Sequence, residues 1–160
     1  MSSGVPRRSL LACCAILGAS AGCTSGDDGT GQGGQAAAAT PQGLRRRAAR
    51  DSTALLARYD ATVSAHPALA GTLTAFRDTV AAHVTTLNES ETAAPGAAGT
   101  TPEVPAEPDR ALTALADAER HTADERLRDL AEAPPEFARL LASLAAAGAA
   151  QSYLLSEARP

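Results

Sequence analysis

Residues 69–87 read LAGTLTAFRDTVAAHVTTL and carry the clearest structural pattern in the chain. Five apolar side chains and one histidine recur at intervals of four, three, four, three and four residues, namely Leu69, Leu73, Phe76, Val80, His83 and Leu87. An α-helix has 3.6 residues per turn, so this spacing puts all six on one face. We therefore expect a helix over about 68–88 that buries this face against other helices.

Three further segments show the same helical period. Their inward stripes are Leu44, Ala48, Leu55, Tyr59 and Val63; Leu112, Leu115, Glu119, Ala123, Leu127 and Leu130; and Phe137, Leu140, Leu141, Leu144, Gly148, Gln151 and Leu155. Pro67 ends the first helix and Pro134-Pro135 separate the last two, with Pro135 suited to open the fourth. Asp109 is the expected N-cap of the third helix. Helices over about 44–66, 68–88, 109–132 and 135–157, with no strand pattern, predict an all-α fold.

The lengths of the connections predict how the four helices are joined. The first two helices are closely linked, as are the last two, so each pair should be antiparallel. The segment 88–108 is long enough to run the roughly 30 Å length of a bundle of twenty-residue helices. One long crossover between helices 2 and 3 is the connectivity of ferritin-like folds. We therefore predict a ferritin-like four-helix bundle over 43–158.

The first 23 residues have the features of an export signal. Arg7 and Arg8 make a basic start, residues 9–22 are uncharged and mostly apolar, and Ser20-Ala21-Gly22-Cys23 resembles a bacterial lipobox. Residues 1–22 are expected to be a lipoprotein signal peptide, through either the Sec or the twin-arginine route. Cys23 would then carry the lipid, and residues 23–42, rich in Gly, Ala and Thr, would form a flexible tether.

Cysteine usage and charge exclude several functions. Cys13 and Cys14 would leave with the signal and Cys23 would be lipidated, which leaves no thiol for disulfides, metal ligation or catalysis. Loss of Arg7 and Arg8 leaves 12 basic against 18 acidic residues. An acidic domain with two Tyr, two Phe and no Trp is a poor nucleic-acid binder.

Two longer stretches carry a family resemblance. They are LLARYDATVSAHPALAGTLTAFRDTVAAHVTTL over 55–87, and ALADAERHTADERL followed by PPEFARLLASLAAAGAA over 114–150. In helix layout and alanine-rich texture, about 44–157 of the chain resembles uncharacterised ferritin-like domains of actinobacterial exported lipoproteins. The resemblance implies a ferritin-like bundle held at the outer face of the cell membrane by a lipid anchor such as palmitate.

The metal-ligand set of ferritin-like proteins is incomplete in this sequence. Such sites use a Glu from each of two helices and a Glu-x-x-His pair from each of the others. The pair is replaced by Val80 and His83 in the second helix and by Gly148 and Gln151 in the fourth. Glu119 lies on the third stripe, and the first helix has no glutamate. We expect no metal and no other cofactor.

Two arrangements are open for Glu119, because a carboxylate on an apolar face requires a partner. It would either reach the rim of the bundle and pair with Arg126 or Arg77, or form a buried polar pair with His83. His121 is expected to be solvated.

Arg45, Arg46, Arg47 and Arg50 form a basic cluster where the first helix begins. Such a cluster contacts anionic headgroups or an acidic partner, or is a solvated turn in which Arg47 pairs with Asp51. We expect a membrane-anchored, non-enzymatic binding or scaffolding module that acts on an envelope protein and not on nucleic acid. A weakly metal-binding or redox bundle using His83 and Glu119, or a carrier of a small apolar ligand, are the alternatives.

Overall fold

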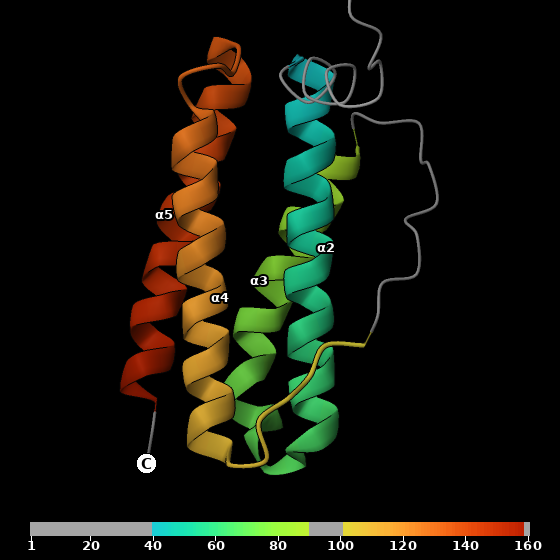
Figure 1. Ribbon diagram of the computed structural model, residues 1–160, viewed down its shortest axis with the longest axis vertical. Helices are drawn as coiled ribbons and strands as arrows, with labels where there is room; N and C mark the ends of the chain where they lie inside the picture. The colour runs from blue at the N-terminus through green and yellow to red at the C-terminus, as the bar shows by residue number, and fades with distance from the viewer. Residues whose placement is uncertain (1–39, 90–100, 159–160) are drawn as a thin grey trace, which may run out of the picture.

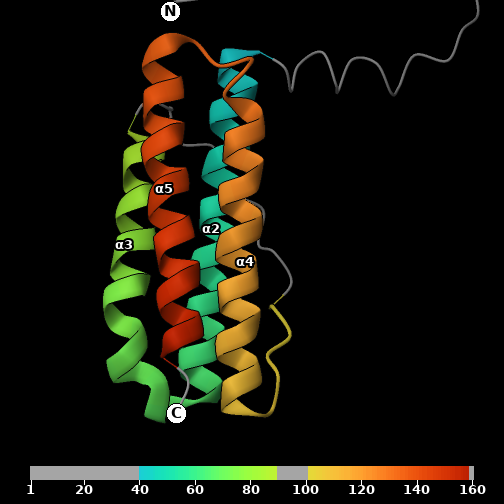
Figure 2. The same ribbon diagram turned by 90° about the vertical axis from the view of Figure 1, so that its left-hand side faces the viewer.

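The computed structural model describes residues 40–89 and 101–158, which form a bundle of four long helices (Figures 1 and 2). The helices are α2 (Pro41–Ala65), α3 (Ala70–Asn88), α4 (Pro108–Asp129) and α5 (Pro135–Glu157), and a single 3-10 turn, η1 (Pro67–Leu69), joins the first two. The described residues contain no strand. The prediction of an all-α fold with four helices is confirmed.

Local chemistry sets the helix ends. The Thr40 hydroxyl accepts a 3.0 Å hydrogen bond from the Gly43 amide, and Pro41 follows at the first position of α2. Pro41 and Gln42 are therefore helical, which corrects the expected boundary of the tether. Pro108 opens α4, so Asp109 lies in the first turn of the helix. The prediction that Asp109 is the N-cap is therefore wrong, because Glu107 holds that position. Pro135 opens α5 as expected.

The directions of the helices follow from the connections. In Figure 1, α2 descends and α3 returns upward, whereas α4 rises and α5 descends. The paired helices are thus antiparallel, and α3 and α4 run the same way. Chain leaving α3 at one end of the bundle re-enters α4 at the other end. The expected signal peptide, Cys23 and most of the expected tether lie outside the described residues.

The core consists of two apolar clusters. One lies toward the end where α4 begins and contains Leu55, Tyr59, Leu73, Val80, Leu112, Leu115, Ala116 and Leu155. The other lies toward the opposite end and contains Leu44, Ala48, Ala49, Leu87, Phe137, Leu141 and Leu144. Between them each helix contributes inward-facing polar or glycine positions: Ser52, His83, Glu119 and Arg126, and Gly148 and Gln151. The bundle therefore has a polar layer at mid-height.

Candidate functional site

Glu119 lies in this polar layer and is the least exposed acidic side chain among the described residues. It is only 1% exposed, and its Oε1 accepts a hydrogen bond of 2.8 Å from the Tyr59 hydroxyl of α2. Burial raises the pKa of Glu119 to about 7, although the hydrogen bond from Tyr59 and the nearby charge of Arg126 both lower it. At neutral pH this carboxyl group is therefore close to the midpoint of its titration.

Gly148 of α5 makes room for this carboxyl group. A Cβ atom at position 148 would lie 3.3 Å from Oε2 of Glu119 and 3.4 Å from the Cβ of Ala123. Because α4 and α5 approach so closely here, the absence of a side chain lets the carboxylate fit beside the α5 backbone. The inward glycine of the sequence pattern is thus part of the Glu119 environment.

Arg126 is the second charged group of the layer and is 3% exposed. Its guanidinium donates to the Leu144 carbonyl at 3.1 Å through Nη1 and to the Ser52 hydroxyl at 2.8 Å through Nη2. Ser52 in turn donates to the Ala48 carbonyl at 2.8 Å. Nε of Arg126 has no hydrogen-bond partner among the described residues. Burial lowers the pKa of Arg126, and Glu119 and Asp51 oppose this effect.

His83 is half-buried on α3, and its pKa is lowered to about 4. Burial is the larger cause and the positive charge of Arg126 is the second. Its imidazole is therefore neutral at pH 7. Within the described residues no hydrogen bond or ion pair joins His83 to Glu119. The predicted pair is corrected, because the partner of Glu119 is Tyr59.

The rim arrangement expected for Glu119 is also wrong. Arg77 lies on the outside, where its Nε donates to Asp60 at 2.6 Å. Arg126 is itself buried, whereas Leu127, assigned to the inward stripe from the sequence, is 52% exposed. The inward face of α4 is therefore rotated slightly from the predicted stripe and includes Arg126. Glu119 and Arg126 are seven residues apart, which is about two helical turns and puts them on the same face of α4. This spacing could have predicted from the sequence that Arg126 faces inward.

The positions that would carry Glu-x-x-His pairs face inward or nearly so. Val80, Gly148 and Gln151 are buried and His83 is half-buried. The Gln151 amide donates to the Phe76 carbonyl at 3.1 Å, and its Oε1 lacks a partner in the described part of the chain.

This donor set does not fit a pair of divalent cations. A guanidinium occupies the polar layer, and a fixed positive charge opposes cation binding. Within residues 40–89 and 101–158, no group of three or more His, Cys, Asp or Glu side chains could hold a metal ion. The interior chemistry is that of a neutral imidazole, an arginine and one carboxyl group.

The basic cluster at the start of α2 is partly engaged within the bundle. Arg45 lies over the ring of Phe137, with its guanidinium carbon 4.5 Å from the ring centre. Arg47 donates to Asp129 at 3.1 Å, so its ion-pair partner is on α4 and is not Asp51 as expected. Arg46 and Arg50 are exposed.

An open groove of about 610 Å³ lies between α2 and α4. Its walls carry both signs of charge, and the lining residues are Arg47, Asp51, Ala54, Leu55, Arg58, Ala114, Asp117, Ala118, His121, Thr122 and Glu125. Burial raises the pKa of Asp51 against the neighbouring arginines, Arg50 first. His121 is exposed as predicted and lies 3.8 Å from Glu125. The α2 wall carries Arg47, Arg58 and Asp51, and the α4 wall carries Asp117 and Glu125, so positive and negative side chains lie close to balance across the groove.

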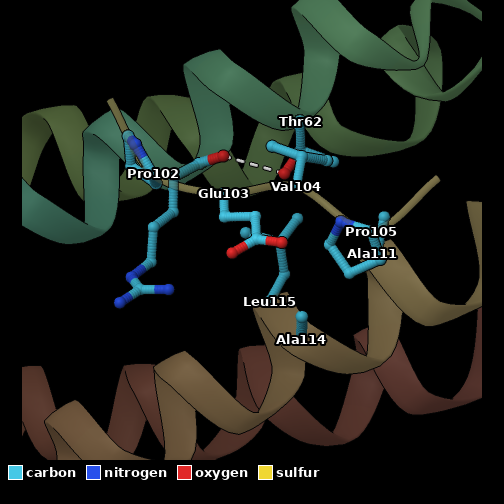
Figure 3. A pocket seen from close by; sticks show the side chains of 9 residues that line it. Thr62, Pro102, Glu103, Val104, Pro105, Ala111, Ala114 and Leu115 are labelled. Atoms are coloured by element: carbon cyan, nitrogen blue, oxygen red, sulfur yellow. Dashed lines mark hydrogen bonds between the residues drawn. The ribbon is translucent and has the colours of Figure 1, made fainter. Parts of the chain in front are cut away.

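Residues 102–105 cover the same α2–α4 seam closer to the start of α4 (Figure 3). His66 fixes this segment, because its Nε2 lies 2.8 Å from the Pro105 carbonyl, an oxygen that can only accept. The hollow beneath measures about 20 Å³, enough for about one water molecule. It is too small for a substrate.

None of the described helices combines the length and the apolarity needed to cross a lipid bilayer. Comparisons with protein-family models, with curated proteins and with solved structures find no match to this chain.

Proposed function

We propose that this chain is an exported lipoprotein, anchored through Cys23 to the extracytoplasmic face of the cell membrane. Its bundle is a ferritin-like domain without an intact metal centre, and it acts as a non-enzymatic binding or scaffolding module for an envelope protein. The export signal and the lipobox-like Ser20-Ala21-Gly22-Cys23 support the anchor. The parallel course of α3 and α4 (Figure 1) supports the ferritin-like connectivity.

The position of Arg126 is the main support for a non-enzymatic role. Its guanidinium lies in the polar layer, where a metal-loaded bundle would need carboxylates, and it is fixed by Leu144 and Ser52. The carboxyl group of Glu119 is likewise bonded to Tyr59. These polar groups thus stabilise the packing of α2, α4 and α5 against one another, which suits a rigid module better than a reactive centre.

Metabolic labelling with a clickable palmitate analogue tests the anchor. The chain is expressed in a bacterial host, together with Cys23→Ala and, as a matched control within the signal, Cys13→Ala. We expect label and membrane recovery for the parent chain and for Cys13→Ala, and loss of both for Cys23→Ala. Equal labelling of all three chains, or of none, would overturn the anchor.

Elemental analysis after incubation with Fe²⁺, Mn²⁺ or Zn²⁺ tests the bundle. We expect less than stoichiometric metal and no change in melting temperature. Stoichiometric metal that is lost in His83→Ala and in Glu119→Gln would replace the proposal by a metal-binding or redox function. A co-purifying apolar ligand, detected by mass spectrometry, would replace it by a carrier function.

A further inference from the structure

The outward face of α5 differs from the outward face of its neighbour α4. From Leu140 to Ser156 the sequence contains no charged residue, although many side chains there are exposed. Tyr153 is 65% exposed and Leu154 is 49% exposed. On α4 the exposed positions include Asp117, Arg120, Asp124 and Arg128. Charge is the usual means by which a helix keeps its outer face solvated, so its absence from α5 requires an explanation.

The exposed residues at the centre of this face follow a coiled-coil spacing. They are Arg139, Ser143, Ala146, Ala150, Tyr153 and Glu157, at intervals of four, three, four, three and four residues. This is the a/d spacing through which two helices pack along a common seam. No described element of the bundle covers this seam, which we call the α5 seam.

The positions of the α5 seam are spaced symmetrically about the level of Gly148. Counting outward from this level, Ala146 matches Ala150, and Ser143 matches Tyr153. At the two ends Arg139 matches Glu157, an opposite charge. An antiparallel second copy of α5 would therefore place alanine against alanine at the centre and opposite charges at both ends.

We propose that the partner of the α5 seam is a second copy of this chain, packed antiparallel through α5 about a two-fold axis level with Gly148. Such an interface is isologous, so each contact occurs twice. Alanine at the centre lets the helix axes approach to about 8 Å, the close end of the usual range. Tyr153 of each copy lies over Ser143 of the other.

Charge selects the antiparallel arrangement over the parallel one. In a parallel pair Arg139 would face a second Arg139, and Glu157 a second Glu157. Both ends would then repel. The intrachain contact from Arg139 to Glu136 is 3.9 Å long, and both side chains are about four-fifths exposed. A contact this exposed leaves the arginine able to pair with Glu157 of the second copy.

The small area of the seam indicates a weak association. Arg139 to Glu157 spans about 27 Å of helix, which buries about 300 Å² on each copy. Stable dimers bury about 800 Å² on each partner. The pairing is therefore weak and reversible. It is independent of the lipid anchor, so its failure would leave the proposed function standing, and the reverse also holds.

Sedimentation equilibrium of the full chain in a mild detergent tests the pairing, at concentrations from about 10 µM to about 1 mM. Ala150→Arg places charge and bulk at the centre of the seam, and Ala54→Arg is the matched control, since Ala54 is exposed on the α2–α4 side. We expect a monomer–dimer equilibrium in the parent chain and in the control, and at least about tenfold weaker association in Ala150→Arg at equal helical circular dichroism. Monomer at every concentration, or equal association of Ala150→Arg and the control, would overturn the proposal.

Charge reversal tests the antiparallel register. Arg139→Glu and Glu157→Arg each place like charges at both ends of the seam, whereas the double variant restores opposite charges. We expect each single variant to associate several-fold more weakly than the parent chain and the double variant to recover. A double variant as weak as the single ones would overturn the antiparallel register and hence the proposal.

Discussion

The Tyr59 hydroxyl of α2 donates a 2.8 Å hydrogen bond to the Glu119 carboxylate of α4, across an interior in which Glu119 is 1% exposed. The bond links two helices that do not follow one another in the chain, so it helps to set how the α2–α3 pair lies against the α4–α5 pair. A buried carboxyl group that lost this donor would keep its desolvation cost without compensation. The stability of the bundle should therefore respond to changes at either residue.

Tyr59→Phe should destabilise the bundle more at pH 9 than at pH 5. Burial raises the pKa of Glu119 to about 7, so the lost hydrogen bond is to a charged acceptor at pH 9 and to a neutral one at pH 5. Hydrogen bonds to charged groups contribute about 1.5–3 kcal/mol and neutral ones about 1 kcal/mol. Urea unfolding at both pH values measures the difference. Tyr153→Phe, at a position exposed in the single chain, is the control. At protein concentrations of about 1 µM, where the α5 seam is unpaired, it should have no effect.

Glu119→Gln should change the pH dependence of stability. The folded pKa of Glu119 is raised from 4.5 to about 7, so between these values the folded chain binds more protons than the unfolded chain. The stabilising contribution is therefore complete below pH 4.5 and is lost as pH rises through 7. Relative to the glutamine variant, the parent chain should lose up to about 3 kcal/mol over this range.

Urea unfolding at pH 5, 6, 7 and 8 gives the free energy of unfolding of the parent chain and of Glu119→Gln. Subtracting one from the other cancels the contributions of the groups that titrate alike in both chains. A difference that does not vary with pH would show that Glu119 titrates in the folded chain as it does in the unfolded chain. Asp117→Asn, at an exposed position two residues earlier on the same helix, is the matched control for removing a carboxyl group from α4.

Gly148→Ala should be unfavourable in the parent chain and favourable once Glu119 is truncated. Alanine is about 1 kcal/mol better than glycine inside a helix, but its Cβ would lie 3.3 Å from Oε2 of Glu119. Tyr59 holds that carboxylate in place. In Glu119→Ala the nearest obstacle is gone and the new methyl group fills part of the space.

A double-mutant cycle measures this relation. We expect a coupling free energy of about 1–2 kcal/mol between Gly148→Ala and Glu119→Ala. Gly71→Ala is the control, because nothing lies within 4 Å of a Cβ atom at that position, and its effect should add to that of Glu119→Ala. Additive effects at positions 148 and 119 would show that the two residues are not packed together in solution.

The sequence predicted the helices well because each has an unambiguous period and a proline at or shortly before its start. Prolines 67, 108 and 135 are each at or beside a helix start, and the stripe over 69–87 places Leu73, Val80 and Leu87 at zero exposure. The inward-facing Gly148 and Gln151 were predicted for the same reason. Periodicity is a property of one helix and can be read without knowledge of the others.

The partners inside the polar layer were less predictable. Tyr59 was assigned to the apolar stripe, and nothing in its own helix indicates that its hydroxyl meets Glu119, 60 residues later. Arg126 and Leu127 are adjacent, and a small rotation of α4 decides which of them is buried. The longer side chain is inside because the Leu144 carbonyl and the Ser52 hydroxyl accept its hydrogen bonds. These acceptors come from other helices, so only the packed bundle reveals them.

Arg126→Met should raise the pKa of His83. That pKa is lowered from 6.5 to about 4 by burial and then by the positive charge of Arg126. Methionine keeps much of the length of the side chain and removes the charge, so the charged imidazole becomes less unfavourable. NMR titration of the imidazole, assigned with His83→Gln, measures the change. Arg120→Met, exposed on the same helix, should leave the titration as it is.

The same variants also predict how the free energy of unfolding of the bundle changes at acid pH. Because the folded pKa of His83 lies below its unfolded value, the contribution of His83 is complete above pH 6.5 and is lost as pH falls through 4. Arg126→Met should therefore weaken the decline of stability between pH 6.5 and pH 4, relative to Arg120→Met. Glu119→Gln should leave the pKa of His83 near that of the parent chain, since Glu119 is not among the groups that shift it. A large fall in that pKa in Glu119→Gln would instead restore the direct pairing of His83 with Glu119 that the sequence suggested.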